Sequence, residues 1–156
     1  MRFINLDHGL ELYGPETFPI PEHLAALASN PTIIACPGST TCTKGLVNCW
    51  AAADEIRQVL TGQHLQEVRI NISGCPNNCA HGAVSDIGLV GLLQKRNGKL
   101  AESYRLFRGG GNGRNDKPAK QSEIIYAQDI AAAVKRLLEP AKSDEDQNQR
   151  LFFPYP

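Results

Sequence analysis

The stretch that decides the fold is Val68-Arg-Ile-Asn-Ile-Ser-Gly-Cys-Pro-Asn-Asn-Cys79. Its first five residues alternate apolar and polar side chains, which predicts a β-strand. The residues after them are rich in Gly, Pro and Asn, which predicts a loop. This loop carries Cys75 and Cys79, separated by three residues. The stretch therefore predicts a strand that delivers a pair of thiols to a tight loop.

An earlier part of the chain has the same arrangement. A short β-branched strand is predicted for Pro31-Thr-Ile-Ile-Ala35. A loop follows directly, Cys36-Pro-Gly-Ser-Thr-Thr-Cys42, with five residues between its two cysteines. Because each pair follows a predicted strand, we expect both pairs to emerge from the same edge of one sheet.

The remaining elements complete an α+β fold with a mixed β-sheet, because their order is β-α-β, then β-β-β, then α. A turn at Asn97-Gly98 is a strong hairpin signal. Apolar residues at helical spacing predict the helices, and apolar runs predict the strands. These elements are a helix over 43–60, strands over 84–93, 101–107 and 123–127, and a helix over 128–138.

The chain length of 156 residues fits about one domain. We expect a lead-in segment over 1–30, the main domain over 31–140, and a tail over 141–156 that is first polar and then aromatic. The 16 Lys and Arg residues balance the 16 Asp and Glu residues, which argues against a nucleic-acid-binding protein. We see neither an apolar run long enough to span a membrane nor the apolar segment of a secretion signal, so we expect a cytoplasmic protein.

The cysteines point to a metal centre. Five cysteines fit a disulfide framework poorly in a chain without a secretion signal. Four converging thiolates are the usual ligands of a [4Fe–4S] cluster. Zinc sites prefer two to four residues between paired ligands, and the gap between Cys36 and Cys42 is five. The fifth cysteine, Cys49, lies within the predicted helix beside Trp50, where we expect it to pack in the core.

These motifs resemble the signature of the sulfite and nitrite reductase haemoprotein family. The resemblance rests on the two cysteine loops, including Gly74-Cys-Pro-Asn-Asn-Cys79. It continues through Val84-Ser-Asp-Ile-Gly-Leu-Val-Gly91 and Tyr104-Arg-Leu-Phe-Arg-Gly-Gly-Gly-Asn-Gly-Arg114, and covers about residues 31 to 138. It implies helices packed on one side of the sheet, a [4Fe–4S] cluster, and siroheme.

The resemblance also implies roles for individual residues. Cys36, Cys42, Cys75 and Cys79 match the cluster ligands, and Cys79 matches the cysteine that also binds the siroheme iron. Asn77 and Asn78 match the backbone that wraps the cofactors. Siroheme carries many carboxylates, and Arg and Lys bind carboxylates through charge-assisted hydrogen bonds. We therefore expect siroheme contacts from the basic residues that flank the glycine-rich loop, namely Arg108, Arg114, Lys117 and Lys120.

The implied function is a reductase module for sulfite or nitrite. Members of the family are several times longer, and the basic residues that hold their substrate come mostly from other portions. We therefore expect a partner subunit, self-association or a larger enzyme to complete the site, and a separate protein to donate electrons. Two alternatives stay open. One is an iron–sulfur electron-transfer subunit without siroheme, and the other is a precorrin-oxidising enzyme of corrin biosynthesis.

Overall fold

The computed structural model describes residues 2–6, 10–14, 30–63, 65, 68–111 and 117–139. The first two ranges are the strands β1 (Arg2–Leu6) and β2 (Leu10–Gly14), which pair antiparallel in a two-stranded sheet. These two strands were not predicted from the residue pattern. Arg114, most of the lead-in and the predicted tail over 141–156 lie outside the described residues.

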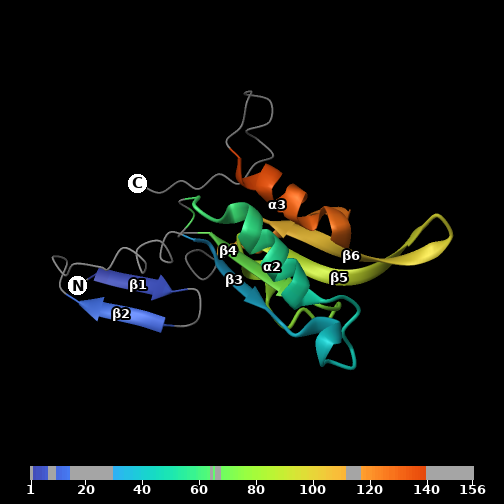
Figure 1. Cartoon of the computed structure of the whole chain (residues 1–156), viewed down its shortest axis with the longest axis horizontal. Coiled ribbons are helices and arrows are strands. Elements are labelled where there is room, and N and C mark those ends of the chain that lie inside the picture. Colours follow the sequence, from blue (N-terminus) through green and yellow to red (C-terminus); the bar gives the residue numbers. More distant parts are fainter. Residues whose placement is uncertain are drawn as a thin grey trace.

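The main sheet has five strands in the order β3-β4-β5-β6-β7 (Figure 1). Its first three strands are parallel and its last two pairings are antiparallel, so the sheet is mixed as predicted. The strands are β3 (Thr32–Ala35), β4 (Arg69–Ser73), β5 (Ile87–Arg96), β6 (Lys99–Arg108) and β7 (Lys120–Tyr126).

Two helices, α2 (Cys49–Leu60) and α3 (Ile130–Leu138), lie on one face of this sheet (Figure 1). The strand register explains why the core forms there. Ile72 is opposite Leu89, and Leu89 is opposite Leu106, so all three side chains point to the same face. They are fully buried with the apolar residues of both helices. Neither described helix is long and apolar enough to cross a membrane.

The prediction that the first helix begins at Thr43 was wrong, because α2 begins at Cys49. Asn48 is its N-cap, and the Asn48 Oδ1 accepts a hydrogen bond from the Ala51 N–H at 3.1 Å. The residues before it form the short 3₁₀ helix η1 (Gly38–Thr40) and a series of turns. Cys49 is thus the first residue of α2 and not a mid-helix residue.

The predicted turn at Asn97-Gly98 is confirmed. Both residues have positive φ, 51° and 79°, as a tight hairpin turn requires. The hairpin extends well beyond the sheet, because β4 ends at Ser73 opposite Val90 whereas β5 continues to Arg96 (Figure 1). After β7, which ends with Tyr126 opposite Ser103, a 3₁₀ turn η3 (Ala127–Asp129) delays the start of α3 to Ile130.

Candidate metal centre

The two cysteine loops leave the sheet side by side, as predicted. β3 and β4 are parallel neighbours, and their register sets Ala35 opposite Ile72. The Cys36 N–H donates to the Ile72 carbonyl at 3.0 Å, which extends this pairing by one residue. The first loop, which begins at Cys36, and the second loop, which carries Cys75, therefore leave the sheet at the same end.

The loops are also joined to each other beyond the sheet. The Leu46 N–H donates to the Gly74 carbonyl at 2.8 Å. Gly38 and Gly74 touch so closely that a Cβ added at Gly74 would lie 2.5 Å from the Gly38 Cα. A Cβ at Gly45 would lie 2.2 Å from the Gly38 carbonyl carbon. These three glycines are required because no side chain fits where the loops meet.

The four predicted ligands differ in exposure. Cys75 is buried, Cys36 is half-buried, and Cys42 and Cys79 are exposed. The Gly74 N–H donates to the Cys36 Sγ at 3.1 Å. A backbone N–H directed at a cysteine sulfur is the type of contact that stabilises a metal-bound thiolate.

Cys49 is fully buried in the core, which confirms the packing interpretation. Its Sγ lies 3.9 Å from the Cys36 Sγ. Burial raises the pKa of the Cys49 thiol far above its ordinary value, and the neighbouring Cys36 raises this pKa further. Sequence reasoning missed the contact with Cys36, because residues 36 and 49 lie on different elements.

The chemistry of this donor set fits a [4Fe–4S] cluster. Within the described residues, no three His, Cys, Asp or Glu side chains gather closely enough to hold one metal ion. In a [4Fe–4S] cluster each of four thiolates binds a different iron, which matches the number of cysteines in the two loops. The glycine-lined loops and the N–H directed at Cys36 suit such a sulfur-rich anion.

The Asn78 side chain holds the second cysteine loop together through hydrogen bonds. Its φ of 53° is left-handed, a conformation that Asn tolerates better than most residues. Its Oδ1 accepts from the Gly82 N–H at 2.8 Å and from the Ser73 hydroxyl at 3.2 Å. The Ser73 Oγ in turn accepts from the Ala80 N–H at 3.0 Å. Asn77 is exposed on the same loop. The cofactor contacts expected of Asn77 and Asn78 stay predictions.

The glycine-rich loop lies against the residues that follow the second cysteine loop. The Gly109 and Gly110 N–H groups donate to the carbonyls of Asp86 and Ser85, both at 3.0 Å. The Ala119 N–H donates to the Ala83 carbonyl at 2.7 Å. These bonds bring the predicted basic residues towards the chain that follows Cys79.

The three basic residues that the structure describes differ in exposure. Arg108 is half-buried and lies opposite the exposed Lys120 in the β6–β7 register. Lys117 is also exposed, and its carbonyl accepts from the Gly111 N–H at 3.0 Å. Their siroheme contacts stay predictions, as does that of Arg114.

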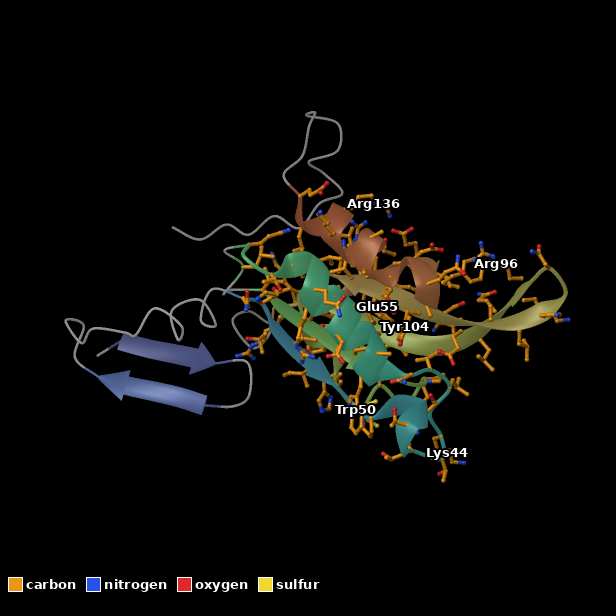
Figure 2. The ribbon with its side chains drawn as sticks, viewed as in Figure 1. Lys44, Trp50, Glu55, Arg96, Tyr104 and Arg136 are labelled. Atoms are coloured by element: carbon orange, nitrogen blue, oxygen red, sulfur yellow. The ribbon has the colours of Figure 1, made fainter. Side chains whose placement is uncertain are left out.

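Asn48 is a site residue that sequence reasoning missed. It holds the N-terminus of α2 directly after the first cysteine loop, and the Thr40 hydroxyl of that loop donates to its Oδ1 at 3.3 Å. Lys44 and Trp50 mark this end of the molecule in Figure 2. The available signal was the residue type, since Asn is among the preferred N-caps.

Comparison with known protein families decides the classification. The model of the nitrite and sulphite reductase 4Fe-4S domain matches residues 28–151, which is most of the chain. The chain belongs to this family. The 4Fe-4S domain also has similar curated relatives. A ferredoxin–nitrite reductase of Synechococcus elongatus is 30% identical over 108 residues, covering 67% of this chain and 21% of the relative.

A second relative points to the sulfite branch of the family. The sulfite reductase [NADPH] hemoprotein beta-component of Leptospira biflexa is 39% identical over 83 residues, covering 47% of this chain and 15% of the relative. A solved structure of Mycobacterium tuberculosis NirA protein shares the fold, with a TM-score of 0.60 and 22% identity over 68% of this chain and 21% of that one. The 4Fe-4S domain thus spans about a fifth of the length of these proteins.

Proposed function

We propose that this chain is the siroheme- and [4Fe–4S]-binding module of a reductase for sulfite or nitrite. The observation that carries the proposal is the pair of cysteine loops, which are hydrogen-bonded to each other at one sheet edge. The matched family model and the reductase relatives support it. In this proposal Cys36, Cys42, Cys75 and Cys79 hold the cluster.

When bound, the cluster and siroheme would supply one-electron transfer and an iron site at which the oxyanion is reduced. Cys79 would also bind the siroheme iron, and its exposure leaves its sulfur accessible on the loop surface. Arg108, Arg114, Lys117 and Lys120 would bind the siroheme carboxylates. The backbone at Asn77 and Asn78 would enclose the cofactors.

The substrate site would be completed outside this chain. The Synechococcus enzyme is about three times as long as this chain, since the matched 108 residues are 67% of this chain and 21% of that enzyme. The proposal therefore includes a partner subunit, self-association or a larger enzyme that supplies the remaining substrate contacts. Electrons would come from a separate donor protein. A cluster built on four thiolates also needs a compartment that keeps thiols reduced, and we propose the cytoplasm.

Anaerobic purification followed by iron, sulfide and siroheme analysis tests this proposal. We expect about five iron atoms per chain, about four in the cluster and one in the siroheme. Measurement of the solution mass in the same preparation reports whether a partner or a second copy is bound. Zinc without iron, or no cluster after reconstitution with iron and sulfide, would overturn the proposal. Cluster without siroheme would favour the electron-transfer subunit instead.

A further inference from the structure

The Cys49 side chain lies against the two cysteine loops at the point where they meet. Its Sγ is 3.9 Å from the Cys36 Sγ. A Cβ added at Gly38 or Gly74 would lie 3.0 or 3.2 Å from the same sulfur. The fifth cysteine therefore touches a proposed ligand and also the two glycines that bring the loops together.

The direction of the sulfur–sulfur contact follows from the charges. A Cys36 thiolate has no hydrogen, so it can only accept. It already accepts the Gly74 N–H at 3.1 Å. By distance alone either sulfur could donate, so with Cys36 as a thiolate the donor is the S–H of the buried Cys49. The Val47 carbonyl, also at 3.9 Å, is the competing acceptor, but an ionised acceptor forms the stronger hydrogen bond.

We propose that Cys49 is a positioning residue of the metal centre, whose thiol donates to the Cys36 sulfur and raises the reduction potential of the cluster held there. The inference rests on the proposed function, because it needs Cys36 as a cluster ligand. A hydrogen bond to a ligand sulfur favours the reduced cluster, which carries one more negative charge. The Gly74 N–H and the Cys49 S–H would then act on the same sulfur.

The test is a redox titration of the reconstituted full chain, followed by electron paramagnetic resonance. The variants Cys49→Ala and Cys49→Val remove the donor, and valine keeps most of the side-chain volume. Cys49→Ser keeps a donor. Ile56→Val, at a fully buried position of the same helix, is the matched control for a packing change alone.

We expect all variants to bind the same amount of iron as the wild type. At a fixed applied potential, the ratio of reduced to oxidised cluster should fall about tenfold in Cys49→Ala and Cys49→Val, a shift of about 59 mV for one electron. Cys49→Ser and Ile56→Val should stay close to the wild type. The spectrum reports the cluster itself, so a purely structural role of Cys49 would not move this ratio.

Three results would overturn the inference. Unchanged potentials in Cys49→Ala and Cys49→Val would leave Cys49 with a packing role only, while the proposed cluster would stand. Loss of iron from folded Cys49→Ala, Cys49→Val and Cys49→Ser would make Cys49 a ligand itself. Failure of the wild type to form any cluster would overturn the proposed function, and this inference with it.

Discussion

At the scale of single residues, Cys79 is a proposed cofactor ligand that can be replaced without a change in core packing. Its side chain is exposed, so its replacement should not disturb the core. We predict that Cys79→Ser loses siroheme and much of the cluster, because one sulfur would serve both groups. Absorption spectra and iron analysis of the purified variant measure this. Val84→Ala changes an exposed side chain close to the same loop and should keep both groups. Full cofactor content in Cys79→Ala would contradict the assignment.

Tyr104 gives a prediction for alkaline pH. Its ring is buried, and its hydroxyl donates to the Asn48 carbonyl at 3.2 Å. Burial raises the pKa of Tyr104 above its ordinary value, and the neighbouring Cys49 and Glu102 raise this pKa further. The folded chain therefore keeps this proton at a pH where the unfolded chain loses it. The free energy of unfolding consequently falls as pH rises.

The stabilisation from Tyr104 should be complete below about pH 10, the ordinary pKa of tyrosine. Above it, the free energy of unfolding should fall by up to about 1.4 kcal/mol per pH unit from this group. Urea unfolding between pH 8 and pH 11 measures the slope. Tyr104→Phe should flatten it and cost about 1 kcal/mol at neutral pH through the lost hydrogen bond. An equally steep slope in Tyr104→Phe would assign the effect to other groups.

At the scale of elements, the start of α2 depends on one cap. Asn48→Ala removes the acceptor of the Ala51 N–H and should lower the free energy of unfolding by about 1 kcal/mol. Asn48→Asp retains the acceptor and should cost much less. Because the Thr40 hydroxyl also donates to Asn48, the loss should extend into the first cysteine loop. Hydrogen exchange at residues 38–51 measures that extension, and unchanged exchange there in Asn48→Ala would contradict it.

The junction of the two loops gives a second prediction at this scale. Gly74→Ala places a Cβ about 2.5 Å from the Gly38 Cα, so the loops must separate. We expect a large loss of thermal stability and of iron content. Gly62→Ala is the matched control, since nothing lies within 4 Å of its Cβ and only its left-handed φ of 79° is strained. It should cost about 1–2 kcal/mol and keep the iron. Equal iron content in both variants would contradict the role of the junction.

The sequence predicted the elements whose signals are local. The strands before Cys36 and Cys75 and the turn at Asn97-Gly98 were predicted because residue type and spacing specify them directly. The start of α2 was misplaced because the residues from Thr43 onwards carry apolar side chains at helical spacing. Their backbone is instead bonded to the other loop, as the Leu46–Gly74 contact shows. Contacts between the loops, such as that of the Gly74 N–H with the Cys36 Sγ, depend on the parallel pairing of β3 with β4, which no short pattern records.

At the scale of the whole molecule, the two faces of the main sheet differ. Both described helices cover one face (Figure 1). On the opposite face, Gly82 packs closely on Gly88 and covers part of β5. Elsewhere on that face, the apolar residues Ile34 and Ile124 are 47% and 43% exposed. The chain also spans only about a fifth of its relatives. Both observations support the proposal that further polypeptide completes the functional protein.

The hairpin of β5 and β6 also bears on the order of folding. Its pairing is local, with ten paired positions around a two-residue turn. The cysteine loops depend on distant contacts, such as that of the Gly74 N–H with the Cys36 Sγ, 38 positions apart. Local hairpins form in about 1–10 μs, whereas parallel pairing must first close long loops. We therefore expect the hairpin to form early and the β3–β4 edge late.

Kinetic φ-values measure this order. Leu89→Ala in the hairpin should give a high value and Ile33→Val in β3 a low one, and the reverse order would contradict it. If the order holds, iron and sulfide reach a chain whose scaffold already exists but whose thiols are not yet enclosed. Insertion of the cluster would then compete with degradation or aggregation of the half-assembled chain. The abundance of the mature protein in a cell would accordingly follow the iron supply.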